Sequence, residues 1–176
     1  RTGIHIYQAW KDRILPFVGP TVLSGEHLGP AFYYIIAPSF ILTGFNPVMP
    51  AVFTALMGVA SVGLFWWLGR ELFGWQIATM LAALWGVSPQ IISSDRVLWE
   101  PNLIPFFIFL YLTALYKGWG VIAGIALGIL VQLHYPNLLF VGLTILFYVM
   151  HKRPRALMGT VMGFLIILLP FLFYES

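Results

Sequence analysis

The stretch PVMPAVFTALMGVASVGLFWWLG, residues 47–69, contains no charged side chain. A helix needs about 20 apolar residues to cross the roughly 30 Å of hydrocarbon in a lipid bilayer. This stretch therefore predicts a transmembrane helix.

The composition of the whole chain agrees with a lipid environment. Hydrophobic residues make up 60% of the 176 residues and charged residues only 9%, whereas soluble domains carry about 25% charged residues. The aromatic content of 17% fits the gathering of Trp and Tyr at membrane interfaces. The absence of cysteine excludes disulfides and thiolate metal sites.

Six apolar runs predict an all-α, polytopic bundle with about six spans. Residues 1–46 are expected to form an outer loop region that contains an amphipathic helix near its start and a juxtamembrane helix over 31–44. Residues 47–176 are expected to form the transmembrane bundle. The runs cover residues 47–69, 76–92, 102–116, 119–134, 137–150 and 156–173.

The polar breaks between the runs are of two alternating kinds. The breaks at 70–71, 117 and 151–155 carry five basic residues and one acid, whereas those at 1–30, 93–102, 134–137 and 174–176 carry four basic residues and five acids. Basic residues in short loops favour the cytoplasmic side. The first kind is therefore predicted to be cytoplasmic, and the second kind to face outward in a multi-pass protein of the cell membrane.

Small residues recur at helical spacing in the later runs. Gly120, Gly124 and Gly128 are four residues apart, as are Gly159 and Gly163. This spacing lets two helix backbones approach closely in lipid. We interpret these glycines as packing positions and not as functional ones.

Three polar residues in the outward breaks are candidates for ligand binding. Arg96 can hold a phosphate through two parallel hydrogen bonds, or it can pair with Asp95 or Glu100. Glu100 can orient a substrate or cap the helix that starts at Pro101. His134 can ligate a metal or bind a phosphate, or it can be an interfacial residue at a helix end.

Glu26 and His27 are candidates for a divalent-metal site, although two residues do not complete a coordination sphere. No P-loop, GxSxG, HExxH or CxxC pattern occurs in the chain.

Four segments together resemble the GT-C family of integral-membrane glycosyltransferases. The nearest branch contains proteins similar to dolichyl-phosphate-mannose–protein mannosyltransferase and the lipid A aminoarabinose transferase. The segments are GEHLGPAFYYIIAP (25–38), LGRELFG (68–74), SPQIISSDRVLWEPNLIPFF (88–107) and GIALGILVQLHYPNLL (124–139).

The resemblance implies transfer of a sugar from a polyprenyl-phosphate donor to a lipid, glycan or protein acceptor on the outer face of the membrane. It implies a divalent metal ion as a candidate cofactor and no nucleic-acid partner. Expected contacts with the donor phosphate come from residues that match the family's segments: Arg1, Tyr33, Tyr34, Arg96, Glu100, Asn102 and His134.

The family's catalytic acid lies just before the position that Arg1 matches. We therefore expect the chain to be an internal piece of a larger enzyme, inactive alone, with its catalytic base upstream. Asp12 does not match that position. A transporter or flippase of a lipid-linked or charged substrate is the alternative function, and a non-catalytic membrane scaffold is a third. A transporter would be expected to contain structural repeats, and none is evident in the sequence.

Overall fold

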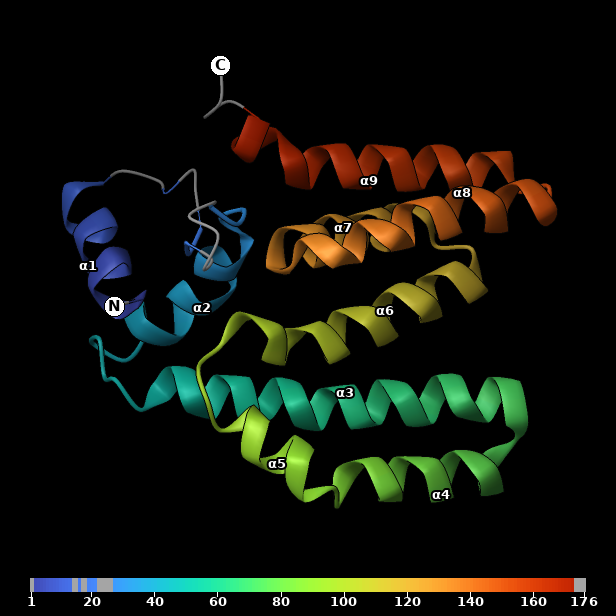
Figure 1. The fold of residues 1–176 in the computed structure, drawn as a ribbon, viewed down its shortest axis with the longest axis horizontal. Helices are drawn as coiled ribbons and strands as arrows, with labels where there is room; N and C mark the ends of the chain where they lie inside the picture. Colours follow the sequence, from blue (N-terminus) through green and yellow to red (C-terminus); the bar gives the residue numbers. More distant parts are fainter. Residues whose placement is uncertain (1, 14–15, 17–18, 22–26, 173–176) are drawn as a thin grey trace.

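The computed structural model describes residues 2–13, 16, 19–21 and 27–172. Within these residues the chain is all-helical, and the only β-type pairing is an isolated bridge between Thr21 and His27. Figure 1 shows the helices after residue 48 running roughly side by side, with two shorter helices across one end. The predicted all-α class is therefore confirmed.

The first two helices form a separate layer at that end. α1 (Thr2–Asp12) and α2 (Ala31–Ile41) match the two helices predicted before residue 46. α1 buries Ile6 and leaves Ile4 and Trp10 exposed. The helix therefore has one apolar side chain in the core and leaves other apolar side chains on the surface.

Each of the six apolar runs is helical, but three of them are interrupted or begin with a 3₁₀ turn. The elements, in the order of the runs, are α3 (Met49–Phe73); α4 (Trp75–Gly86) with α5 (Pro89–Asp95); η1 (Glu100–Leu103) with α6 (Ile104–Lys117); α7 (Gly120–Leu133); η2 (Tyr135–Leu138) with α8 (Leu139–Met150); and α9 (Pro154–Leu172).

The lengths of these helices do not establish six spans. Among the described residues, only α3 is long and apolar enough to cross a membrane, and the α4–α5 pair, bent by 61°, would be a second. Pro89 explains the bend, since proline disfavours helical geometry in the residue before it. α7 has 14 residues and rises about 21 Å, less than the hydrocarbon thickness.

The apolar side chains of α3 mostly face away from the protein. Only 22% of its most apolar window is buried, and Leu56 and Val59 are 61% and 71% exposed. A core helix of a soluble domain would bury this surface instead. Exposed apolar side chains also cover α4, α8 and α9, so the apolar surface extends around the bundle.

The predicted glycine packing is confirmed between α7 and α9. A Cβ atom added at Gly124 would meet the carbonyl oxygen of Thr160, and one added at Gly163 would meet that of Val121. The two backbones are therefore in direct contact. Thr160 also donates a hydrogen bond to the carbonyl of Gly120 across the interface, at 3.1 Å.

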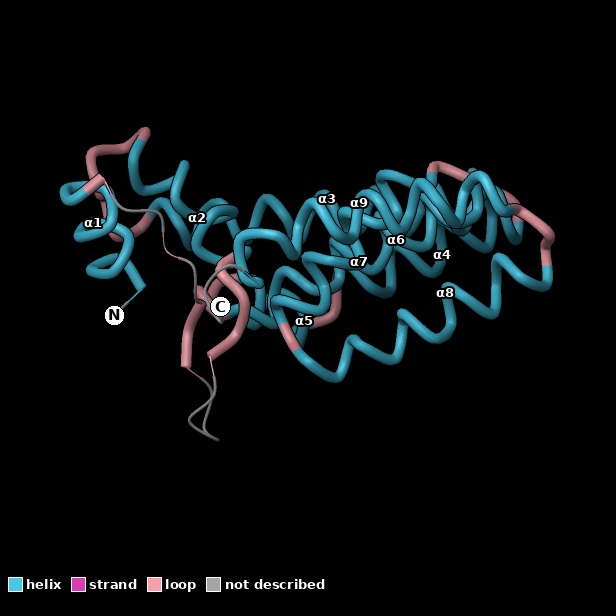
Figure 2. Tube along the Cα trace, turned by 90° about the horizontal axis from the view of Figure 1, so that it is seen from above, coloured by secondary structure: helices cyan, strands magenta, loops and turns pink. Residues whose placement is uncertain are grey.

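The described parts of the two kinds of polar break lie at opposite ends of the bundle (Figure 1). We call the end with the α3–α4, α6–α7 and α8–α9 turns (residues 70–74, 117–119 and 151–155) the basic end. We call the other end, with α1, α2, residues 96–99, η1 and η2, the loop end. Figure 2 shows the same separation from above, with α1 and α2 at one extremity.

Gly58 of α3 allows the side chain of Asp95 in α5 to approach closely. The carboxylate of Asp95 lies where a Cβ atom at Gly58 would be. The side chain therefore occupies space that is free only because residue 58 is a glycine. We expect Gly58→Val to displace α5 and lower the free energy of unfolding by about 1–3 kcal/mol. Thermal unfolding in detergent would measure this. Gly63→Val in the same helix is the control, because nothing lies within 4 Å of its added Cβ. Equal losses of unfolding free energy in both variants would contradict the close approach of Asp95 to Gly58.

Candidate functional site

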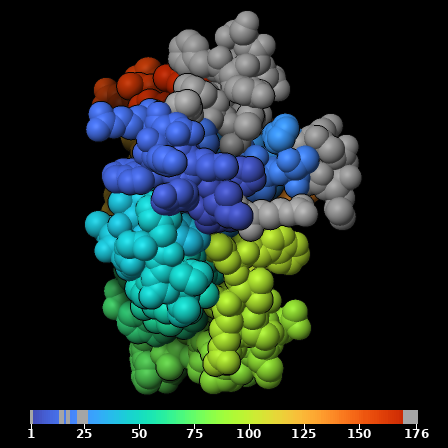
Figure 3. Space-filling view, turned by 90° about the vertical axis from the view of Figure 1, so that its left-hand side faces the viewer, coloured from blue at the N-terminus to red at the C-terminus, as the bar shows by residue number. Residues whose placement is uncertain are grey.

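The loop end contains a cavity of about 620 Å³ between α1 and α2. Figure 3 looks onto this end and shows α1 (dark blue) lying beside α2 (cyan) on the surface. The described residues that line the cavity are mainly apolar or aromatic, with two cations: Ile6, Ala9, Trp10, Lys11, Arg13, Pro16, Tyr33, Tyr34, Ala37 and Ile41.

The two cations stand where α1 ends. Lys11 is in the last turn of the helix and Arg13 follows it, both with exposed side chains. Carbonyl groups at a helix C-terminus favour nearby positive charge. Within the described residues neither cation is in an ion pair with a carboxylate. The cavity therefore combines apolar walls with two cations that are free to meet an anion.

A second cavity of about 420 Å³ shares Pro16 and Tyr33 with the first and adds His5, Thr21 and His27. Beside it, the amide of Gly19 donates a hydrogen bond to the carbonyl of Leu28 at 2.7 Å. Thr21 Oγ1 lies 3.3 Å from His27 Nδ1. The two cavities thus differ in chemistry, since the first is apolar with cations and the second carries imidazoles and a hydroxyl.

Tyr33 lies between the two cavities. It is only 8% exposed, and its ring centroid is 6.3 Å from that of His5. Burial raises the pKa of the Tyr33 phenol, and the nearby Glu100 carboxylate raises it further. Both effects disfavour the phenolate. Tyr33 therefore remains a neutral hydrogen-bond donor at physiological pH.

Tyr34 helps to shape the shared wall. Its hydroxyl donates a 2.6 Å hydrogen bond to the carbonyl of Pro16, which lines both cavities. This bond ties α2 to the segment that follows α1. The predicted role of Tyr34 near the donor is untested, but its position on the first cavity is clear.

Gln132, which the sequence alone did not single out as functional, connects three helices at the loop end. Its Oε1 accepts a hydrogen bond from the buried amide of Ala31 at 3.1 Å, and its Nε2 donates to the carbonyl of Ile167 at 2.7 Å. α2, α7 and α9 therefore meet at one buried amide, which is 3% exposed. A lone glutamine inside the apolar run 119–134 was the available signal.

The stretch around Arg96 lies at the same end but does not line either cavity. Arg96 is exposed, and within the described residues it forms no ion pair with Asp95 or Glu100. Glu100 is the first residue of η1 and is the acidic residue in its first turn. Asn102 is buried, and its Nδ2 donates to the carbonyls of Ser94 at 2.5 Å and Val97 at 2.8 Å. The Asn102 amide thus holds the loop that presents Arg96.

His134 also belongs to the loop end. Its side chain is exposed between α7 and η2, and it does not line either cavity. The neighbouring Tyr135 donates a hydrogen bond to the carbonyl of His27, which connects η2 to the second cavity. The predicted positions Arg1 and Glu26 lie outside the described residues.

The described residues do not assemble a metal site. No group of three or more His, Cys, Asp or Glu side chains comes together among them. His5 and His27 share a cavity, but two imidazoles do not complete a coordination sphere. Glu26, the other predicted ligand, lies outside the described residues, so the divalent ion stays a prediction and no chemical step is assigned to it.

No protein-family model, curated protein or solved structure matches this chain.

Proposed function

We propose that the chain belongs to a membrane glycosyltransferase that moves a sugar from a polyprenyl-phosphate donor to an acceptor on the outer face of the cell membrane. In this proposal the six helical runs each pass through the bilayer, and the loop end faces outward. The order of the four segments that resemble GT-C enzymes supports the reaction class.

The distribution of apolar surface supports the membrane placement. Contiguous exposed apolar surfaces are rare on soluble monomers, whereas here exposed Leu, Val, Ile and Met side chains recur along most of the bundle helices. The runs that are shorter than the hydrocarbon thickness would be accommodated by local thinning of the bilayer or by flanking residues.

The cavity between α1 and α2 is the observation that carries the proposed reaction. A polyprenyl-phosphate sugar has a long apolar chain and an anionic phosphate, and the cavity offers apolar walls with Lys11 and Arg13 beside them. Its volume of about 620 Å³ lies in the range of small-molecule sites. The polyprenyl chain would extend from the cavity along the exposed apolar surface.

The chemistry is displacement at the anomeric carbon of the donor. A base takes the proton of the acceptor hydroxyl, the new glycosidic bond forms, and the bond to the phosphate oxygen breaks. Lys11 and Arg13 stabilise the charge that develops on the departing phosphate. Tyr33 donates a hydrogen bond from its neutral phenol to the donor phosphate. Arg96 adds a positive charge at the same end of the bundle, and His134 offers a ring nitrogen there.

Transfer from a defined donor tests this proposal. The complete protein, purified in detergent, is given polyprenyl-phosphate sugars and an acceptor mixture, and released polyprenyl phosphate is measured. We expect Arg13→Gln to raise the KM for the donor about tenfold or more, because a charge-assisted hydrogen bond contributes about 1.5–3 kcal/mol.

Arg70→Gln is the matched control, since it removes the same charge at the basic end, and its KM should stay unchanged. Absence of transfer with every donor, or equal effects of the two substitutions, would overturn the proposed site.

Transport of a lipid-linked substrate is the second candidate, and one observation favours it. The α4–α5 pair is bent by 61° at a short break, and broken helices are typical of transporters. Movement of a labelled polyprenyl-phosphate sugar across proteoliposomes, without release of polyprenyl phosphate, would identify this function instead.

A further inference from the structure

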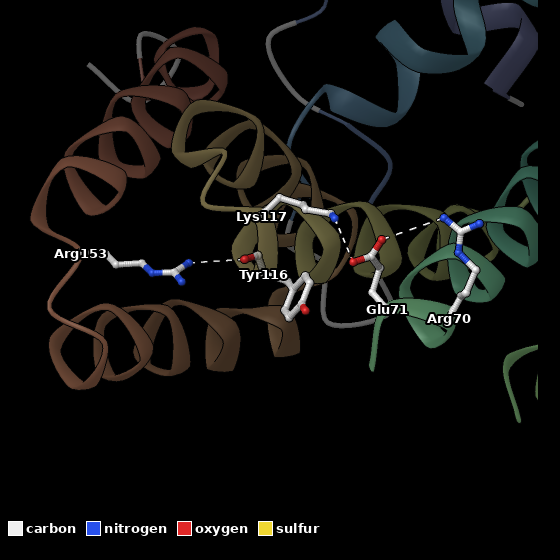
Figure 4. Close-up of polar contacts among 5 residues, drawn as sticks. All are labelled: Arg70, Glu71, Tyr116, Lys117 and Arg153. Atoms are coloured by element: carbon white, nitrogen blue, oxygen red, sulfur yellow. Dashed lines mark hydrogen bonds and ion pairs between the residues drawn. The ribbon is translucent and has the colours of Figure 1, made fainter. Parts of the chain in front are cut away.

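The basic end has a strong excess of positive charge. Five basic residues, Arg70, Lys117, Lys152, Arg153 and Arg155, belong to its three turns, together with one acid, Glu71. Lys117 Nζ lies 3.1 Å from the Glu71 carboxylate and Arg70 lies 4.0 Å from it (Figure 4). The acid is therefore already partnered.

The three cations of the α8–α9 turn have no carboxylate partner within the described part of the chain. Lys152, Arg153 and Arg155 are exposed, and no ion pair involves them. Arg153 reaches toward the α6–α7 turn, where its Nη1 donates a long 3.4 Å hydrogen bond to the carbonyl of Tyr116 (Figure 4). Its guanidinium thus lies between two turns with most of its donors unused.

An apolar groove lies at the start of α7, just after the α6–α7 turn toward which Arg153 reaches. It has a volume of about 360 Å³ and is lined by Trp119, Gly120, Val121 and Ile122. Gly118, which precedes the groove, approaches Arg153 closely, since a Cβ atom added there would lie 3.7 Å from Nη1. Trp119 is anchored against Trp67 of α3, with ring centroids 6.0 Å apart.

A guanidinium without a carboxylate partner among the described residues, next to an apolar groove, matches the anionic headgroup and the acyl chain of a phospholipid. Basic clusters on the cytoplasmic side of membrane helices attract anionic headgroups, at about 1 kcal/mol per basic residue. A neutral headgroup would gain less from the excess charge. The groove, beginning at a tryptophan of the kind found at membrane interfaces, suits an acyl chain.

We propose that the basic end binds an anionic phospholipid, with the phosphate on Arg153 and one acyl chain in the groove of Trp119–Ile122. Lys152 and Arg155 add to the positive field around the headgroup. The site is distinct from the cavity at the loop end. It rests on the membrane placement within the proposed function and does not depend on glycosyl transfer.

Lipid binding to the complete protein in a neutral detergent tests the proposal. The probes are phosphatidylglycerol and phosphatidylcholine with the same oleoyl chains, titrated and counted by native mass spectrometry. We expect the Kd for phosphatidylglycerol to be about tenfold lower, and Arg153→Gln to raise it about tenfold. Arg70→Gln removes the same charge at the same end from a side chain that is already paired with Glu71, so it should raise the Kd much less than Arg153→Gln does.

A substitution in the groove tests the acyl-chain half independently of Arg153. Ile122→Asn should weaken phosphatidylglycerol binding severalfold, whereas Leu146→Asn, at an exposed position on α8, should not. Equal affinity for the two lipids, or equal effects of Arg153→Gln and Arg70→Gln, would overturn the site.

Glycerol 3-phosphate serves as a headgroup without acyl chains. If glycerol 3-phosphate binds as tightly as phosphatidylglycerol, the ligand is a soluble phosphate compound and the proposal is overturned. Because no sugar donor is present in these titrations, a failure here is distinct from a failure of the transfer reaction.

Discussion

Replacing Gly124 by leucine is expected to separate α7 from α9 and to cost about 3 kcal/mol or more of unfolding free energy. An added Cβ would meet the carbonyl oxygen of Thr160 and would lie 2.7 Å from the amide nitrogen of Phe164. Both neighbours are backbone atoms, so no side-chain rotation can relieve the collision. The helices must move apart and lose the interface hydrogen bond from Thr160 to Gly120.

Thermal unfolding in detergent, with limited proteolysis of α9, measures this effect. Gly142→Leu in α8 is the matched control, because an added Cβ there meets nothing within 4 Å. Both substitutions replace glycine within a helix and raise helix propensity by a similar amount. A Gly124→Leu protein as stable as the Gly142→Leu protein would contradict direct backbone contact between α7 and α9.

Replacing Gln132 by methionine is expected to destabilise the protein by about 2–5 kcal/mol and to detach α2 from the bundle. Methionine has a similar length but cannot replace either hydrogen bond. The amide of Ala31 and the carbonyl of Ile167 would then lose their partner in a buried region, and each unsatisfied group costs about 1–3 kcal/mol. Because α2 carries Tyr33 and Tyr34, the cavity at the loop end would also lose its shape.

Unfolding and protease sensitivity of the segment before α2 check this prediction. Gln76→Met is the control, since Gln76 is exposed on α4. Gln132→Glu tests the two hydrogen bonds individually. A carboxylate can accept a hydrogen bond from the amide of Ala31 but cannot donate one to the carbonyl of Ile167. Equal behaviour of Gln132→Met and Gln76→Met would show that the buried amide is not a structural link.

The helices could be predicted from local patterns, whereas their interruptions were only partly predictable. Each apolar run became helical, and the glycine spacing in 120–128 and 159–163 correctly indicated close packing. The run 76–92 was expected to be continuous, yet it bends before Pro89. The proline was visible in the sequence, but the size and direction of the bend depend on how α5 packs against α3.

The candidate site was likewise only partly predictable from local sequence patterns. Tyr33, Tyr34 and His27 were selected from the sequence, and the structure places all three on the cavities of the loop end. Arg96 and His134 lie at that end without lining either cavity. Lys11 and Arg13 were visible as outward charges, but nothing local showed that they border a cavity with α2.

By itself, the sequence determined the helical class, the positions of the helices, and the separation of two kinds of polar break. These features depend on residues close together in the chain, whose spacing directly sets which side chains share a helix face. Only the tertiary structure decided that Gln132 meets the amide of Ala31, 101 residues away. It also decided that a cavity opens between α1 and α2. Contacts of this kind depend on how whole helices pack, and no local pattern encodes them.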